Sequence, residues 1–243
     1  MRNWFRYSLA GAAIVIGALL LILVIGAARR AHARVSCDRI EVRFEDEHRF
    51  FSDDDIRSFL DKRYGVYTGQ PLDSVDLGRI ERLLEGQSAI RRCEAWTTDD
   101  GVLHLSILQR NPVVRFVNGE DGFYADAEGV LFPLFPSYTA PVRVVEGRAD
   151  NDPAWIAAVV AMVRYLDTHP AVGERIARIT TAGGEMTLLP AEGAERFLIG
   201  RPEDFRARLP KIQEYYDYIS PLENNYKTIN LKYNGQIICR KGI

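Results

Sequence analysis

The side chains that could carry out catalysis are scattered along the chain. The four histidines fall in different predicted elements: His32, His48, His104 and His169. The sequence lacks the short patterns that bring a zinc pair, a nucleophile or a phosphate loop together, such as H-E-x-x-H, G-x-S-x-G, a Walker loop or G-x-G-x-x-G. A triad assembled in space leaves no such pattern, so a hydrolase stays open as the third hypothesis. The pattern favours a protein that is not an enzyme, with no cofactor, no catalytic residue and no metal site.

Three other groups could do chemistry, and each has a simpler structural interpretation. Ser52 followed by the acidic run 53–55 is typical of a helix start rather than of a metal or acid/base site. Gly183-Gly184 indicates a turn rather than a phosphate-binding loop. Cys37, Cys93 and Cys239 lack metal-ligand spacing. Two of these cysteines could pair outside the cytoplasm, but burial as small apolar side chains is favoured for at least one.

One long apolar segment predicts a membrane anchor. Residues 7–28 form 22 consecutive uncharged positions. A helix of that length reaches roughly 33 Å, enough to cross a hydrocarbon core. We therefore expect a tail at 1–6, a transmembrane helix at 7–28 and a linker at 29–34. Ala31-His32-Ala33 resembles a processing site, so a cleaved signal peptide is the alternative.

The charges around the apolar segment do not set its direction. Arg2 and Arg6 precede it, whereas three arginines follow it within the linker. The positive-inside rule therefore does not place the N-terminus in the cytoplasm. Beyond residue 34 the chain holds 26 basic and 33 acidic residues, a net charge of about −7. Such a balance argues against a surface that binds nucleic acid.

The first part of the remainder has the pattern of a compact β-α-α-β-β unit. Alternation around Val42 and Phe44 predicts a strand, and the capped segment 53–64 predicts a helix that ends at Gly65. A second helix follows from Asp73 or Asp76 to Gly86. Two strands, at 90–97 and 102–108, flank the hairpin signal at 99–101. Asn111-Pro112 is a natural boundary, so the predicted domain covers 35–111.

Residues 112–243 have the pattern of a mainly β domain with two helices, which gives an α+β fold class for the whole chain. Strands are expected at 113–117, 123–124, 130–132, 142–145, 176–180, 186–189 and 196–199. One helix starts at Pro153, and another covers 203–218 with a kink or late start at Pro210. Tyr215, Tyr216 and Tyr218 at helical spacing indicate core packing with one exposed ring rather than a binding patch. Two closing strands, 228–233 and 236–240, flank a hairpin signal at Asn234-Gly235.

This order of parts resembles the bacterial cell-division family FtsQ/DivIB. The stretch that runs from a helix through a hairpin to Gln109-Arg110-Asn111-Pro112 is similar to the POTRA segment of that family. The phrase FYADAEGVLFPL is similar to the opening of its β domain, with Asp126, Gly129 and Pro133 at the expected places. The phrase YKTINLKYNGQIICRK is similar to its closing strands. Pro210 and the arginines around the apolar segment depart from the family pattern.

The resemblance implies a non-enzymatic scaffold of the division apparatus. Proteins of this family recruit the membrane proteins FtsB and FtsL and link them to the septal wall-synthesis machinery. It further implies a cytoplasmic N-terminus, an extracytoplasmic bulk, and a location in the inner membrane at the division septum. An alternative that keeps the POTRA unit is a chaperone or assembly factor for envelope proteins, although such proteins usually carry repeated units or a barrel.

The closing strands are the predicted partner-binding site. A terminal strand at a sheet edge exposes unpaired N–H and C=O groups, so a partner strand can be added to it. If 228–233 or 236–240 is such an edge, the backbone supplies affinity and neighbouring side chains supply specificity. The alternative is that both strands are internal and their side chains belong to the core. The partner-binding residues carried over from the resemblance are Tyr233, Asn234, Gly235, Gln236 and Ile237.

Overall fold

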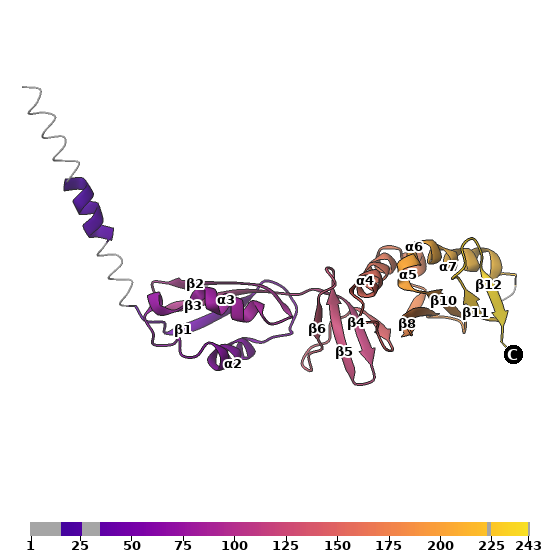
Figure 1. Cartoon of the computed structure of the whole chain (residues 1–243), viewed down its shortest axis with the longest axis horizontal. Helices are drawn as coiled ribbons and strands as arrows, with labels where there is room; N and C mark the ends of the chain where they lie inside the picture. The colour runs from indigo at the N-terminus through magenta and orange to yellow at the C-terminus, as the bar shows by residue number, and fades with distance from the viewer. Residues whose placement is uncertain (1–15, 26–34, 223–224, 243) are drawn as a thin grey trace, which may run out of the picture. The chain divides into compact units, whose positions relative to one another are not determined.

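A computed structural model describes residues 16–25, 35–222 and 225–242 of the chain (Figure 1). Residues 16–25 are helical, and their large apolar side chains are 46–67% exposed. No helix within the described ranges is long and apolar enough to cross a membrane. The rest of the predicted span, the tail at 1–6 and nearly all of the predicted linker lie outside the described residues.

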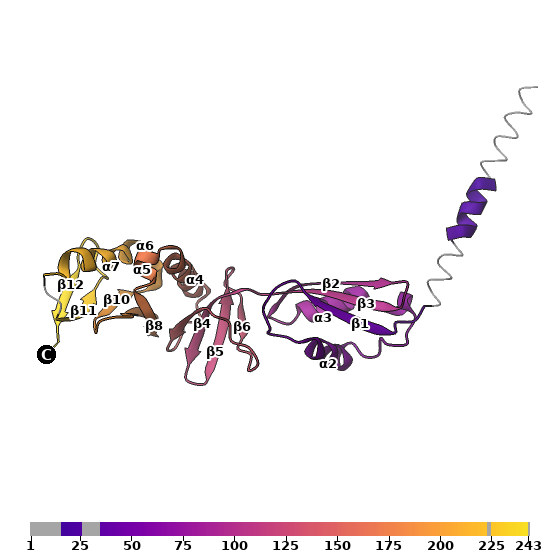
Figure 2. The same ribbon diagram turned by 180° about the vertical axis from the view of Figure 1, so that it is seen from behind.

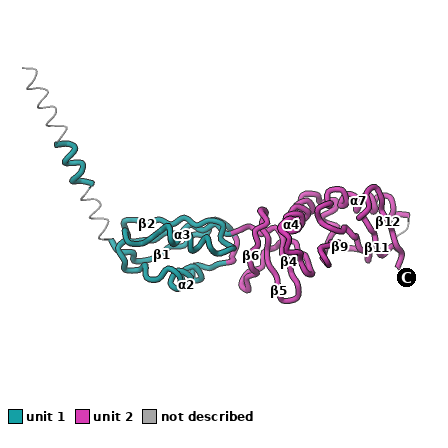
Figure 3. Tube along the Cα trace, viewed as in Figure 1, with its two compact units in different colours: residues 1–47, 51–109 teal, residues 48–50, 110–243 magenta. Residues whose placement is uncertain are grey.

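The described chain forms two compact units (Figure 3). The first contains the residues up to Glu47 together with Phe51–Gln109, and the second contains His48–Phe50 together with everything from Arg110 onward. Each unit has its own apolar core. The chain therefore contributes a three-residue segment to the second unit before it completes the first.

The first unit has the predicted β-α-α-β-β order. Its elements are β1 (Arg39–Phe44), α2 (Asp53–Arg63), the 3₁₀ turn η1 (Leu72–Ser74), α3 (Leu77–Glu85), β2 (Ile90–Thr98) and β3 (Val102–Gln109). The three strands form a sheet of order β1-β3-β2, in which β1 is parallel and β2 antiparallel to β3. Alternate side chains of the sheet pack against both helices, as the two-residue period of the strands requires.

Local signals in the sequence explain where these helices start. The Ser52 hydroxyl accepts the backbone N–H of Asp55, while the Asp55 carboxylate accepts the N–H of Ser52, which is a complete capping box. Asp76 caps α3 through one bond, in which its carboxylate accepts the N–H of Arg79. The acidic run 53–55 is thus the start of a helix, as the sequence indicates.

Both edges of this small sheet are bonded by side chains from the flanking helices. On the β2 edge, the backbone N–H groups of Cys93 and Ala95 donate to carboxylates of α3, at 3.2 Å to Glu85 and 2.9 Å to Glu81. On the β1 edge, the Arg57 guanidinium of α2 donates to the carbonyl of Ile40 at 2.7 Å. Three of the backbone groups that a neighbouring strand could use are therefore already occupied.

The second unit is built on one nine-stranded sheet. Its strands are β4 (Pro112–Asn118), β5 (Asp121–Asp126), β6 (Leu131–Pro133), β7 (Arg143–Glu146), β8 (Ile176–Ala182), β9 (Glu185–Pro190), β10 (Arg196–Gly200), β11 (Tyr226–Asn230) and β12 (Ile238–Lys241). The spatial order is β12-β11-β10-β9-β8-β7-β4-β5-β6. The edges of the sheet are thus β6 and β12.

The helices of this unit cover one face of the sheet, as Figure 1 and the view from behind in Figure 2 both show. They are α4 (Pro153–Thr168), α5 (Pro170–Gly173), the 3₁₀ turn η2 (Pro202–Asp204), α6 (Phe205–Arg208), α7 (Pro210–Glu214) and the π-helical turn η3 (Tyr215–Ile219). Their apolar residues join those of the strands in one core. No helix lies on the opposite face within the described residues of this unit.

Two features of the helical layer compare directly with the sequence. Pro210 is the first residue of α7, so the predicted late start is confirmed, and the single helix expected over 203–218 is divided. The ring cannot accept the preceding helical geometry without losing a hydrogen bond, whereas the first turn of a helix tolerates it. The short helix α5 was not predicted.

The segment His48–Phe50 completes an aromatic cluster in the second unit. Phe50 is 2% exposed, and its ring lies 5.1–5.6 Å from rings of the β5–β6 region. These rings belong to Tyr124, Phe132, Phe135 and Tyr138. Close aromatic packing of this kind adds to the area that is buried. The side chain of Phe50 is therefore part of the core of a unit formed mainly by residues 60 or more positions later.

Replacing Phe50 by Ala should destabilise the second unit by about 3–5 kcal/mol, because it removes a fully buried ring and leaves a cavity. Hydrogen exchange of the full chain should show faster exchange of the amides of β5 and β6. Phe51→Ala is the matched control, since Phe51 packs against the core of the first unit. Equal exchange in β5 and β6 for both variants would contradict the assignment of Phe50.

Candidate partner-binding site

The two closing strands differ in their place in the sheet. β11 lies between β10 and β12, parallel to the first and antiparallel to the second. β12 pairs with β11 on one side and forms the outer strand of the sheet. Of the two candidate edges in the sequence, the first is internal and the second is the edge.

The predicted partner-binding residues lie in the loop that joins these strands. β11 ends at Asn230 and β12 begins at Ile238, so residues 231–237 form the loop. The turn predicted at Asn234-Gly235 is present, since the N–H of Gln236 donates to the carbonyl of Tyr233 at 3.4 Å, but the strands predicted to flank it directly are wrong. Gly235 does adopt the left-handed conformation (φ +67°) that made it a turn signal. The five residues Tyr233, Asn234, Gly235, Gln236 and Ile237 are thus contiguous in one wide loop.

A buried lysine explains why the loop is wide. The ammonium of Lys211, on α7, donates to the carbonyl oxygens of Tyr233 at 2.5 Å and of Leu231 and Gln236 at 3.4 Å each. Lys211 is only 8% exposed. The carbonyl of Tyr233 thus accepts both this ammonium and the N–H of Gln236 across the turn. Three acceptors match the three donors of an ammonium, which offsets the cost of burying the charge.

Further contacts fix both ends of the loop. The backbone N–H of Leu231 donates to the carbonyl of Leu198 at 3.0 Å, and the N–H of Lys232 donates to the Asn230 carboxamide at 3.0 Å. The Lys232 ammonium also pairs with the Glu185 carboxylate. The Tyr233 side chain lies on this fastened loop and is 54% exposed. A ring held in that way loses little freedom on binding, which suits it as an interface anchor.

The three tyrosines of 215–218 occupy the places that the sequence predicted. Tyr215 is 1% exposed in the core, and the ring of Tyr216 packs against Phe197 while its hydroxyl donates to Glu195 at 3.1 Å. Burial, and then the charge of Glu195, raise the pKa of Tyr216 well above its ordinary value. Tyr218 is 72% exposed. The prediction of core packing with one exposed ring is confirmed.

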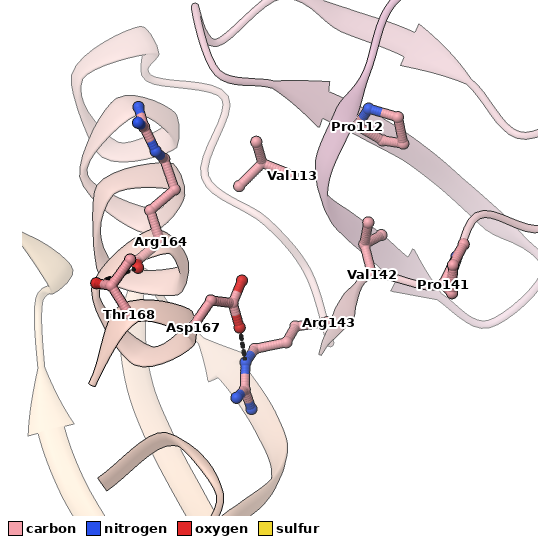
Figure 4. Close-up of a pocket in the computed structure, with 8 residues that line it drawn as sticks. All are labelled: Pro112, Val113, Pro141, Val142, Arg143, Arg164, Asp167 and Thr168. Carbon is pink, nitrogen blue, oxygen red and sulfur yellow. Dashed lines mark hydrogen bonds and ion pairs between the residues drawn. The ribbon is translucent and has the colours of Figure 1, made fainter. Parts of the chain in front are cut away.

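The pocket drawn in Figure 4 has no arrangement suited to catalysis. It measures about 620 Å³ and is lined by Pro112, Val113, Pro141, Val142, Arg143, Arg164, Asp167 and Thr168. Each nitrogen of the Arg143 guanidinium donates one hydrogen bond, to the Asp167 carboxylate at 2.6 Å and to the carbonyls of Ile176 and Gly173 at 3.1 and 3.0 Å. Its charge is thus paired with a carboxylate, and three of its five donors are used within the fold.

The histidines do not come together either. His48 contacts Tyr138 and Asn111, His104 stacks on Trp96, and His169 stacks on Tyr165. His32 lies outside the described residues. Within the described part of the chain, no group of three or more His, Cys, Asp or Glu side chains could hold a metal ion. Gly183 and Gly184 form the turn between β8 and β9.

The three cysteines are free thiols, and two of them are buried. Burial raises the pKa of the Cys93 thiol to about 12, and the carboxylates of Glu81 and Glu85 add to the rise. The pKa of Cys239 is also raised by burial, although its side chain is partly exposed. A thiol so far from its thiolate form is a poor nucleophile at neutral pH.

Alkylation should distinguish the three thiols by their rates of labelling. With iodoacetamide at about pH 8, the native chain should be labelled at Cys239 well before Cys93 or Cys37, because the latter two are both buried and protonated. Mass spectrometry of the labelled peptides measures the order, and the unfolded chain, in which all three react, is the control. Fast labelling of native Cys93 would contradict the burial and the raised pKa.

The folds of the two units define the class of the protein: a POTRA-like domain followed by a β domain that ends in an open strand edge. Residues 35–108 match the family of the POTRA-like domain, and residues 111–240 match the family described as FtsQ/DivIB, C-terminal related. No curated protein matches the chain. Since the second match covers more than half of the sequence, the chain belongs to the FtsQ/DivIB-related family.

Membership in this family confirms the resemblance that the local phrases predict. This membership relates the chain to cell-division proteins of the envelope, whose partners are other division proteins. The FtsQ/DivIB proteins to which the family is related are not enzymes. Lys211 is the residue of the site that the sequence did not indicate. A lysine next to Pro210 gives no sign that its ammonium is buried among carbonyls of a loop 20 or more residues later.

Lys211→Met should loosen the loop 231–237, because methionine fills the space but cannot donate to the three carbonyls that the ammonium binds. We expect a loss of about 1–3 kcal/mol in the free energy of unfolding and faster exchange of the loop amides. Urea unfolding and hydrogen exchange measure the two effects. Lys227→Met, at an exposed position on β11, is the control. Unchanged exchange in the loop of the Lys211 variant would contradict the role given to this ammonium.

Proposed function

We propose that this protein is a non-enzymatic division scaffold that binds FtsB-like and FtsL-like membrane proteins and links them to the septal wall-synthesis machinery. The observation that carries the proposal is the outer strand β12 beside the loop 231–237, which is bonded to Lys211 and exposes the side chain of Tyr233. A partner segment could add to this edge as a further strand, with main-chain hydrogen bonds for affinity and side-chain contacts for specificity.

The other strand edges are less suited to such addition. β1 and β2 of the first unit are bonded by Arg57, Glu81 and Glu85. β6 is three residues long and includes Pro133, which has no N–H to donate. Within the described residues, no helix or loop side chain bonds to the backbone of Ile238, Cys239 or Arg240. The edge at β12 is thus the best candidate for a docking strand.

Each residue of the proposed site has a distinct part. The exposed ring of Tyr233 is the anchor, and Ile237 packs partly against the core and supports the start of β12. Gly235 permits the turn, while Asn234 and Gln236 supply polar groups at the rim of the interface. The carbonyl of Gln236 is already held by Lys211, so the loop would bind without much reordering.

The proposal includes the arrangement in the envelope. Residues 7–28 would cross the inner membrane, with a short cytoplasmic tail at 1–6 and a linker at 29–34. The domains 35–111 and 112–243 would then lie outside the cytoplasm at the division septum. In that position a membrane-anchored partner meets the β domain without diffusing through the envelope.

A chaperone or assembly factor for envelope proteins is the second candidate, since residues 35–108 are POTRA-like. A chaperone that held substrates by strand addition would need an open edge in that unit. The carboxylates of Glu81 and Glu85 occupy two N–H groups in the middle of the β2 edge, which disfavours this function.

Tyr233→Glu should reduce co-purification of FtsB-like and FtsL-like proteins at least about tenfold, because it removes an interface anchor and adds a charge. Tyr218→Glu is the matched control: it introduces the same charge at another exposed tyrosine. Gln236→Pro tests the loop backbone independently. Tyr233→Glu and Tyr218→Glu should retain the thermal stability of the unchanged chain, whereas Gln236→Pro also removes the N–H that donates to the carbonyl of Tyr233.

Two outcomes would count against the proposal. Equal recovery of the partners with Tyr233→Glu and Tyr218→Glu would contradict the binding role proposed for the loop. Fluorescence of a tagged chain that is uniform over the envelope of dividing cells, in place of a band at mid-cell, would contradict the proposed function in division. Crosslinking to barrel substrates would favour the chaperone.

A further inference from the structure

A second pocket of the second unit lies on the helical layer, between α4 and α6. It measures about 330 Å³, and its lining residues are Ala161, Arg164, Tyr165, Thr168, His169 and Arg206. The first four are spaced three or four positions apart, so they share one face of α4. Arg206 belongs to α6. Two guanidinium groups from two helices therefore border one pocket, and none of its lining side chains is acidic.

The charge of Arg164 is not balanced within the fold. Arg164 is exposed, and no carboxylate of the described residues lies within ion-pair distance of it. Asp167, the acidic residue of α4, is bonded to Arg143 at 2.6 Å. Figure 4 shows the Arg164 side chain extending from the helix away from this pair. The Arg164 guanidinium is therefore available to an anion from solution.

Arg206 is positioned by an aromatic ring and not by an acid. Its guanidinium lies over the ring of Phe205, 5.1 Å from the ring centre. Phe205 is 4% exposed, and its ring meets the ring of Tyr165 edge-on at 5.6 Å. Such a contact orients a cation but leaves its charge in place. The nearby Asp204 is paired with Arg208, and within the described residues no carboxylate pairs with Arg206.

The end of α4 is modified in a way that reduces its repulsion of an anion. The last carbonyl groups of a helix are usually unpaired and carry partial negative charge. Here the Thr168 hydroxyl donates to the carbonyl of Arg164 at 2.9 Å, and Nδ1 of His169 lies 2.9 Å from the carbonyl of Tyr165. The backbone N–H of His169 donates to the carbonyl of Leu166 at 3.4 Å. Carbonyl groups beside the pocket are thus already bonded.

The pair of guanidinium groups favours a phosphate over a carboxylate. A carboxylate has two oxygens, which a single guanidinium satisfies. A phosphomonoester has three free oxygens and a charge of about −1.5 to −2 at neutral pH, so it can bridge two arginines and balance both charges. The rings of Tyr165 and His169 stack with centres 3.7 Å apart and planes 12° apart. They provide a flat surface for the organic part of the ester.

We propose that the α4–α6 pocket binds a small phosphomonoester, with its phosphate between Arg164 and Arg206 and its organic group on the stacked rings. None of the lining residues belongs to β12 or to the loop 231–237, so the inference does not rest on the proposed function. The same phosphate chemistry occurs in soluble esters and in the head group of phosphatidic acid. The experiment distinguishes these two sources.

The test measures how fast phenylglyoxal, which reacts with accessible guanidinium groups, modifies each arginine of the full chain in neutral detergent. Glycerol 3-phosphate at about ten times its half-protection concentration should slow the modification of Arg164 and Arg206 about tenfold, as mass action requires. Mass spectrometry of the peptides measures the rates. Arg63, which is exposed on α2, is the internal control and should not be protected. Sodium acetate at the same ionic strength should protect both arginines several-fold less.

Variants show whether the two arginines bind one phosphate. In Arg164→Gln, the concentration of glycerol 3-phosphate that protects Arg206 should rise roughly tenfold or more, because hydrogen bonds to a charged group are lost. Arg206→Gln should have the same effect on Arg164. Arg63→Gln is the matched control and should leave the protection unchanged, as should Tyr233→Glu, which alters the proposed partner site. Thermal unfolding verifies that each variant is folded.

A lipid arm identifies the source of the phosphate. The full chain is placed in nanodiscs of phosphatidylcholine, in which part of the lipid is replaced by phosphatidic acid or by phosphatidylglycerol. Protection by phosphatidic acid without protection by glycerol 3-phosphate identifies a lipid head group, and the reverse identifies a soluble ester. Protection by both means that the pocket accepts the phosphate from either source. Phosphatidylglycerol, a phosphodiester, should protect less than phosphatidic acid.

Three results would overturn the inference. The first is the absence of protection by every phosphomonoester, and the second is equal protection of Arg63. The third is equal protection by acetate or by phosphatidylglycerol, which would show an unselective response to negative charge. Since Tyr233→Glu tests the partner site separately, protection of Arg164 and Arg206 supports this pocket whether or not FtsB-like proteins co-purify with the chain.

Discussion

The hydrogen-bonding needs of strand edges are the constraint on which much of this structure depends. A sheet that does not close has two outer strands, and their outward N–H and C=O groups need partners. The first unit meets this need with long side chains from its helices, since Glu81, Glu85 and Arg57 reach the backbone of β2 and β1. The second unit ends β6 after three residues and uses a proline there. β12 is treated differently, since within the described residues no helix or loop side chain bonds to the backbone of Ile238, Cys239 or Arg240.

The loop beside β12 shows how a charge can shape a surface without touching a partner. Lys211 faces carbonyl groups in place of a carboxylate, so its ammonium holds main chain rather than a single side chain. A carboxylate would satisfy the lysine equally well but would leave the loop backbone to water. Because three carbonyls from both halves of the loop converge on one atom, the position of Tyr233 depends on the helical layer as well as on the sheet.

Much of the fold could be read from local signals, and the rest depends on contacts that are distant in sequence. The capping residues Ser52 and Asp76 and the proline at 210 mark helix starts because their effect is local. The turn at Asn234-Gly235 forms as its local signal predicts, but the strands around it are shorter than predicted because a lysine on another element binds the carbonyls of the connecting residues. The same holds for the choice of edge strand: pairing order in a nine-stranded sheet is set by the whole core, and no short pattern states it.

The place of Phe50 in the second unit has a consequence for synthesis of the chain. Domains generally fold as units from the N-terminus while the ribosome adds about 5–20 residues per second. The first unit can close once β3 has emerged, but Phe50 must remain exposed to water until Tyr124 and Phe132 have been made. For some seconds, the large apolar side chain of Phe50 is therefore exposed while the first unit is already folded. In that interval the nascent chain offers a target to chaperones that the mature protein no longer has.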